Sequence, residues 1–189
     1  MKRVSILFTA VAMVAACGES PTTPIDGPAP QFATTVSPNA NKVTVTGLDD
    51  LLNIDRLTIT PVGQSGRLKF EGQQHGAFNM TASDPAFDIV DGTLIVEFHV
   101  NVDATNTGSG GGKVTIEDGN GEVAWEGIWE GRSVNGVNDG EIVTQGRGDF
   151  ERMTLKFSFI EIDPLALPDI EPADGDTNHF YFEGVILGT

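Results

Sequence analysis

The stretch Thr93-Leu-Ile-Val-Glu-Phe-His-Val-Asn-Val-Asp103 decides the fold of this chain. From Leu94 onward every second side chain is apolar, Glu97 and His99 fall on the alternate positions, and Ile95 is the one exception. A β-strand points successive side chains to opposite faces of its sheet, so a period of two predicts a strand with one buried face. The stretch therefore predicts a sheet whose apolar face packs in a core.

The same period of two recurs along most of the chain after residue 41. We expect one short helical turn at residues 48–54 and no amphipathic helix of useful length. Roughly eight to ten short strands without crossover helices predict an all-β, antiparallel meander, closed as a small, roughly eight-stranded β-barrel or stacked as a β-sandwich. Turn-forming residues separate the strands at Asp91-Gly92, Gly108 to Gly112, Asp118-Gly-Asn-Gly121 and Asn138-Asp-Gly140.

A repeated three-residue motif, an aromatic residue followed by Glu-Gly, favours the barrel over the sandwich. In a strand the aromatic residue and the glycine share one face, and the glutamate points to the other. Glycines on the inner face let strands bend sharply, and a ring from a neighbouring strand can lie over the bare backbone, as closed barrels require. The motif occurs at Phe70-Glu-Gly72, Trp125-Glu-Gly127, Trp129-Glu-Gly131 and Phe182-Glu-Gly184.

Part of the chain resembles a known family of barrels. Residues 112–162 contain Trp125-Glu-Gly-Ile-Trp-Glu-Gly131 and Gly146-Arg-Gly-Asp-Phe-Glu-Arg-Met-Thr-Leu-Lys-Phe-Ser-Phe159. This segment resembles the small eight-stranded barrels of the allene oxide cyclase and dirigent type. The resemblance implies the fold alone, because no catalytic residue of those families matches a position in this chain.

Large aromatic side chains fall on the expected inner face of the strands. Burial of each ring contributes roughly 1.5–3 kcal/mol, which suits a core of this size. An eight-stranded barrel has room for side chains or for one small molecule. The rings therefore either fill the interior or line a pocket for a small apolar ligand. The candidate ligand-binding residues are Phe98, Trp125, Trp129, Phe157, Phe159, Phe180 and Phe182.

The first residues of the chain have the layout of a bacterial lipoprotein signal. Lys2 and Arg3 precede an apolar stretch, residues 4–16, that is too short to cross a bilayer of about 30 Å as a helix. Val14-Ala15-Ala16-Cys17 resembles the lipobox of bacterial lipoproteins. The resemblance implies cleavage before Cys17 and lipidation of its thiol. An ordinary secretory signal with an incidental cysteine is the alternative.

The organisation expected from these signals has three parts. Residues 1–16 are the signal peptide, residues 17–41 are the lipidated cysteine and a linker rich in proline, threonine and serine, and residues 42–189 are a single β-barrel domain. The resemblance implies an exported protein anchored to the bacterial envelope. The glycine at position 18, where an aspartate resembles an inner-membrane retention signal, favours the outer membrane or the cell surface.

The mature chain is strongly acidic. The sequence has 27 acidic and 11 basic residues, a formal net charge of −16. Removal of residues 1–16 takes away Lys2 and Arg3, which leaves 9 basic residues and a net charge of −18. Such a field repels phosphate backbones, so we expect no nucleic acid among the partners. Cys17 is the only cysteine, so we expect no intrachain disulfide.

One acidic segment near the end of the chain has some features of a metal site. Asp174, Asp176 and Asn178 place oxygen ligands at alternate positions, as calcium loops do. His179, however, stands where an EF-hand has glycine, and Val185 stands where it has glutamate. We therefore favour an acidic surface loop, with calcium as the alternative and no other cofactor.

The sequence shows no recognisable catalytic set. It lacks a Gly-x-Ser-x-Gly motif, and its three histidines fall in separate segments, where we expect them on the surface. Glu126 and Glu130 lie roughly 13 Å apart along one strand, too far for a pair of glycosidase carboxylates. Glu161 shares a face with Phe157 and Phe159, and it is the one carboxylate that we expect to be partly buried.

Three functions follow from these observations. The first is a membrane-anchored envelope lipoprotein whose non-catalytic barrel presents an acidic surface to a protein partner. The second is a carrier or sensor of a small hydrophobic ligand inside the barrel. The third is a cyclase-like barrel enzyme of unknown substrate. The lack of a reactive cluster favours the first.

Overall fold

The computed structural model describes residues 42–64, 66–162 and 178–188 of the chain. The chain divides into two compact units, Met1–Ala40 and Asn41–Thr189, and all described residues belong to the second. The expected signal peptide, Cys17 and linker lie outside the described residues.

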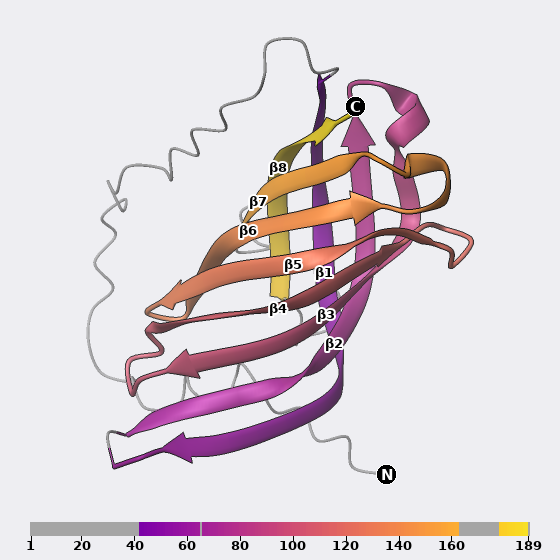
Figure 1. Ribbon diagram of the computed structural model, residues 1–189. Helices are drawn as coiled ribbons and strands as arrows, with labels where there is room; N and C mark the ends of the chain where they lie inside the picture. The colour runs from indigo at the N-terminus through magenta and orange to yellow at the C-terminus, as the bar shows by residue number, and fades with distance from the viewer. Residues whose placement is uncertain (1–41, 65, 163–177, 189) are drawn as a thin grey trace, which may run out of the picture. The chain divides into compact units, whose positions relative to one another are not determined.

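Eight antiparallel strands form a closed barrel in which each strand pairs with its neighbours in the sequence and β8 pairs with β1 (Figure 1). The predicted all-β barrel is confirmed, and the alternative sandwich is not formed. Two 3-10 turns, η2 (Pro85–Phe87) and η3 (Gly148–Phe150), connect strands at one end. The strands are β1 (Lys42–Val62), β2 (Arg67–Ala82), β3 (Ile89–Val102), β4 (Gly108–Glu117), β5 (Val123–Val134), β6 (Val137–Gly146), β7 (Thr154–Ile162) and β8 (Asn178–Leu187).

The first strand is longer than the sequence suggested, and the helical turn expected at residues 48–54 is wrong. β1 runs without a break for 21 residues. Residues 48–51 pair with both β2 and β8, and residues 53 and 54 pair with β2, so the backbone groups that a helical turn would bond internally are bonded to other strands. Register shifts between Leu51 and Asn53 and between Ile54 and Arg56 let the long strand bend while it keeps β2 as its neighbour (Figure 1).

Three of the four expected turns also lie inside strands. Asp91-Gly92 belongs to β3, Gly108 to Gly112 begin β4, and Asn138-Asp-Gly140 belongs to β6. The glycine-rich run is a strand because its residues pair with both β3 and β5. The turn between β5 and β6 is made instead by Asn135 and Gly136, whose φ angles of 53° and 88° suit a two-residue hairpin turn. The remaining expected turn, at Asp118, is confirmed: the Asp118 carboxylate accepts hydrogen bonds from the N–H groups of Asn120 and Glu122, both at 2.9 Å.

Aromatic rings cover glycines of the adjacent strand on the inner face, as the aromatic-Glu-Gly motif predicted. Gly72 of β2 is the register partner of Phe98 of β3, and a β-carbon added at Gly72 would lie 2.7 Å from the Phe98 ring. The same arrangement joins Gly140 of β6 to Phe159 of β7, also at 2.7 Å. Gly47 of β1 likewise faces the Phe182 ring, and Gly112 of β4 faces the Trp129 indole.

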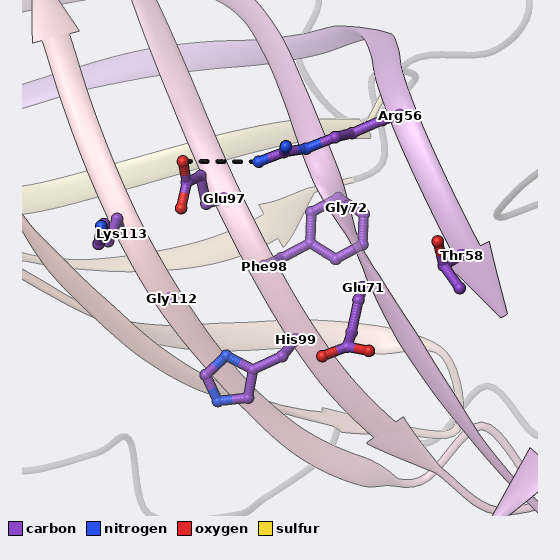
Figure 2. A pocket seen from close by; sticks show the side chains of 9 residues that line it. All are labelled: Arg56, Thr58, Glu71, Gly72, Glu97, Phe98, His99, Gly112 and Lys113. Atoms are coloured by element: carbon purple, nitrogen blue, oxygen red, sulfur yellow. Dashed lines mark ion pairs between the residues drawn. The ribbon is translucent and has the colours of Figure 1, made fainter. Parts of the chain in front are cut away.

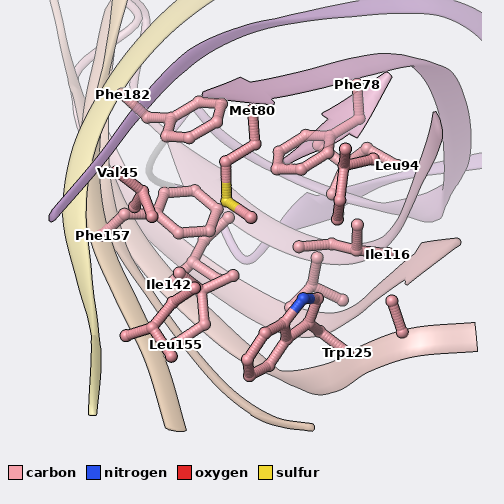
Figure 3. Close-up of a cluster of buried hydrophobic side chains, with 14 of the residues drawn as sticks. Val45, Phe78, Met80, Leu94, Ile116, Trp125, Ile142, Leu155, Phe157 and Phe182 are labelled. Atoms are coloured by element: carbon pink, nitrogen blue, oxygen red, sulfur yellow. The ribbon is translucent and has the colours of Figure 1, made fainter. Parts of the chain in front are cut away.

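The packed core fills one end of the barrel (Figure 3). The rings of Phe78 and Phe182 stack in parallel with centroids 5.0 Å apart, and the ring of Phe157 lies 4.6 Å from that of Phe182. Phe150 of η3 stacks on Trp125 at 5.1 Å and closes this end. These rings have aliphatic neighbours from every strand of the barrel, so the interior here is solid. The buried core consists of Val45, Phe78, Met80, Ile89, Leu94, Val96, Val114, Ile116, Ala124, Trp125, Ile142, Leu155, Phe157, Phe182 and Ile186.

The substitution Gly47→Ala tests the role of the ring-covered glycines. Its added methyl group would overlap both the Phe182 ring and the carbonyl oxygen of Asn79. Overpacking of a tight core costs about 1–3 kcal/mol, so we expect the free energy of unfolding in urea, followed by tryptophan fluorescence, to fall by that amount. The control is Gly188→Ala, because no atom lies within 4 Å of a β-carbon at that position. Equal stability of the two variants would contradict the expectation.

Candidate functional site

The seven rings proposed as a ligand site divide between the two ends of the barrel interior. Trp125, Phe157 and Phe182 belong to the packed core, where they contact other side chains. Phe98, Trp129 and Phe159 are only partly buried and pack against that core from its other side. Phe180 is buried next to them. The structure therefore brings all seven rings to the inner face but leaves only the second group partly exposed.

The rings at the less packed end meet edge to face. The Trp129 and Phe159 centroids lie 6.3 Å apart with planes at 65°, and the Phe159 and Phe180 centroids lie 5.5 Å apart at 86°. The Trp129 indole N–H reaches across Gly112 and donates to the carbonyl oxygen of Glu97 at 2.9 Å. This hydrogen bond fixes the indole plane, because the carbonyl that accepts it belongs to the backbone of β3 and is held in place by the sheet.

Glu161 lies beside these rings, on the inner face that the sequence predicted for it. Phe180 is its register partner on β8. The backbone N–H and the Nδ2 of Asn138 both donate to its Oε2, at 3.0 and 2.6 Å. Burial raises the pKa of the Glu161 carboxyl, and the two hydrogen bonds from Asn138 lower it by a smaller amount. The half-buried environment therefore favours the neutral form of this carboxyl more than the surroundings of an exposed glutamate would.

Further polar side chains are buried in the barrel, and sequence reasoning missed them. Asp49, only 3% exposed, is the register partner of Phe180 on β1. Gln74 of β2 and Ser133 of β5 are also buried. A signal for Asp49 was present, because Val45, Gly47 and Asp49 follow the period of two that places them on one face. The expected helical turn at residues 48–54 obscured it.

A hollow of about 530 Å³ lies on the outer face of β1–β4 (Figure 2). It lies over Gly72 and Gly112, the glycines that Phe98 and Trp129 cover on the inner face. Arg56 reaches Glu97 across β2, with Nη2 and Oε1 3.6 Å apart. Charged groups of both signs therefore border the hollow, which gives it no single preference for an anion or a cation. The residues that line it are Arg56, Thr58, Glu71, Gly72, Glu97, Phe98, His99, Gly112 and Lys113.

The candidate metal residues fall mainly outside the described part of the chain. Asp174 and Asp176 lie beyond it, and Asn178 is the first residue of β8. Among the described residues, no group of three or more histidine, cysteine, aspartate or glutamate side chains could hold a metal ion. The described part likewise has no helix with the length and apolar character needed to cross a bilayer.

The three histidines differ in their surroundings. His99 is exposed, as expected. The His75 ring is partly exposed, and its Nδ1 lies 2.9 Å from Asp55 Oδ1. His179 is only 2% exposed, so the expectation of a surface position is wrong for this residue. It precedes Phe180 in β8 and pairs with Asp50 and Ile162 on the flanking strands.

Comparisons with known proteins add no relative to this account: no family model, no curated protein and no solved structure matches the chain.

The substitution Glu161→Gln should change how stability depends on pH. Since the pKa of Glu161 is raised in the folded protein, its contribution to stability is full below the ordinary glutamate pKa and is lost as pH rises through the raised value. Glutamine stays neutral and can still accept from Asn138. We expect the variant to melt at a higher temperature than the wild type at neutral pH, with the difference shrinking as the pH falls toward 4.

The matched control is Glu151→Gln, at an exposed position after η3. Thermal unfolding of the three proteins across this pH range provides the measurement. A melting difference between Glu161→Gln and the wild type that stays constant with pH would contradict the burial of this carboxyl.

Proposed function

We propose that this protein is an exported lipoprotein, anchored to the bacterial envelope through Cys17, whose non-catalytic barrel presents an acidic surface to a protein partner. The proposed location in the cell envelope is supported by Val14-Ala15-Ala16-Cys17 and by the proline-rich segment that follows it. A single acyl chain holds a protein only marginally on a membrane, so stable anchoring requires two or more chains at Cys17. The linker would then hold the barrel away from the lipid.

A row of carboxylates on the outer face supports the acidic surface. Glu130 of β5 and Glu141 of β6 stand directly opposite each other, Ser158 of β7 is the next partner, and Glu183 of β8 follows. All three glutamates are exposed. Like charges directly opposite in a sheet are destabilising, so this row reduces the stability of the fold. A cationic partner would offset that cost.

The neighbouring positions show that the sequence pairs charges elsewhere on the same strands. One ladder step from the opposed glutamates, Arg132 donates to Asp139 with both Nε and Nη2, at 2.8 and 2.9 Å. On the other side, Ile128 is 56% exposed and faces Val143 on β6. The carboxylate row therefore lies next to an exposed apolar position. This combination suits a partner segment with both basic and apolar side chains.

A second candidate function, binding of a small hydrophobic ligand, is favoured by the less packed end of the barrel. Phe98, Trp129 and Phe159 point into the barrel and yet remain partly exposed. The Glu161 carboxyl beside them could form a hydrogen bond with a polar group of the ligand. A ligand here would be mainly apolar, with one polar group.

The lipid anchor is tested by mass spectrometry on the full chain expressed in a Gram-negative bacterium. We expect a mature N-terminal peptide that begins at Cys17 and carries acyl chains. The variant Cys17→Ala should remain uncleaved or leave the membrane fraction. An unmodified Cys17 thiol in the wild-type protein would contradict the proposed lipid anchor.

The acidic surface is tested by Glu141→Gln, which removes one of the two opposed charges. We expect the free energy of unfolding in urea to rise by about 0.2–1 kcal/mol at low salt, and by less at high salt, because like-charge repulsion is relieved. Binding of a fluorescent oligolysine peptide, measured by anisotropy, should weaken. Glu122→Gln, at an exposed position outside the row, is the control, and identical behaviour of the two variants would contradict the proposal.

A further inference from the structure

The first strand extends beyond the partner that closes the barrel. The ladder between β1 and β8 ends at Leu51 and Asn178, whereas the ladder between β1 and β2 continues to Val62 (Figure 1). Within the part of the chain that the structure describes, residues 53–61 of β1 are therefore paired on one side only. Such an edge presents unpaired backbone N–H and C=O groups, which are a template for another strand.

The groups that face the open edge can be identified from the packing of Gly72. The carbonyl oxygen of Arg56 lies against Gly72 of β2, so Arg56 directs its backbone groups to β2. Successive residues of an antiparallel strand alternate in this respect. Leu57 and Ile59 therefore direct their N–H and C=O groups to the open edge.

The usable part of this edge is short and has defined ends. On one side the register shift between Ile54 and Arg56 interrupts the regular strand. On the other side Pro61 has no N–H group to donate. Between these limits only Leu57 and Ile59 offer both a donor and an acceptor to a new strand.

We propose that this edge pairs with the same edge of a second copy of the chain, antiparallel and about a two-fold axis at Thr58. Leu57 of each copy then lies opposite Ile59 of the other, and all N–H and C=O groups of these residues are paired in four hydrogen bonds. A shift of one ladder step would place Leu57 opposite Pro61, which leaves the carbonyl of Leu57 without a donor. The sequence thus favours one register.

The distribution of charge supports a second copy as the occupant of this edge. Two mature chains of net charge −18 repel each other unless they meet at a part of the surface with little negative charge. Residues 53–75, which include the open edge and the strand behind it, contain Asp55 and Glu71 against Arg56, Arg67 and Lys69, a net charge of +1. A strongly basic partner segment would instead be drawn to the carboxylate row.

Apolar side chains at the edge also have area to bury. Ile54 is 42% exposed and Ile59 is 44% exposed, although both lie in a strand. In the proposed pairing, Ile59 contacts Leu57 of the second copy across the ladder. Cross-strand pairs of branched apolar residues stabilise sheets, so these contacts add to the backbone hydrogen bonds.

The test places a cysteine on the proposed two-fold axis. Thr58 would lie opposite itself in a non-hydrogen-bonded pair, with α-carbons about 4.5 Å apart, which is within the range for a disulfide. In membranes from cells that express the full chain, we expect Thr58→Cys to give a disulfide-linked homodimer after mild oxidation. Thr44→Cys is the matched control, because Thr44 is exposed on a part of β1 that is paired on both sides.

Two outcomes of this cross-linking would overturn the proposal, and a third would bear on the lipid anchor alone. Equal cross-linking at Thr44→Cys would show random collision, and a cross-link to a different protein would show that the edge has another occupant. A homodimer in the wild-type lane would arise from Cys17, which would contradict the lipid anchor and not the edge pairing. The proposed function and this inference therefore fail separately.

A second substitution separates backbone pairing from side-chain contact. Ile59→Pro, added to Thr58→Cys, removes an N–H from the open edge but not from the ladder with β2. Two of the four hydrogen bonds are lost, so the dimer should weaken by roughly tenfold or more, whereas Ile59→Ala keeps them all. Amide exchange of wild-type Leu57 and Ile59 should also slow as protein concentration rises. Exchange that does not change with concentration would overturn the proposal without any variant.

Discussion

At four glycines that face the inside of this barrel, an aromatic ring of the neighbouring strand lies over the backbone. The pairs are register partners, such as Gly72 with Phe98 and Gly140 with Phe159, so each contact joins two strands at a fixed position. The glycine lets the strand curve, and the ring restores the packing that the missing side chain would have supplied. Closure of the sheet, the solid core and the position of Glu161 all follow from this curvature.

The same contacts make the two ends of the interior chemically different. Around Phe182 and Trp125 the rings stack on each other and on aliphatic side chains, which leaves a solid interior. Around Phe159 the rings meet edge to face beside Glu161 and near buried Asp49. Polar groups are tolerated there because Glu161 is hydrogen-bonded to Asn138 and is only partly buried. Any chemistry inside the barrel would therefore be confined to this end.

The sequence predicted those features that depend on local pattern. The alternation of apolar and polar side chains around Leu94 predicted the strands. The aromatic-Glu-Gly motif predicted the closed barrel and the rings over glycines. The sequence did not predict that residues 48–54 continue β1, because that outcome depends on ladders with β2 and β8, which are distant in the sequence. The inward position of Asp49 was missed for the same reason. The turn at Asn135 was missed because its neighbour Asn138-Asp-Gly140 has equally good turn composition.

The proposed acidic surface and the proposed edge pairing use different strands, and this separation has a physical basis. The opposed glutamates lie on β5 and β6, whose two edges are both paired within the barrel, so their backbone offers nothing to a new strand. The open edge lies on β1, in a segment whose basic residues outnumber its acidic ones. A dimer formed at Thr58 would leave the carboxylate row of each copy free. It would thus present two acidic faces to a cationic partner, and binding at both would raise the avidity without any new contact.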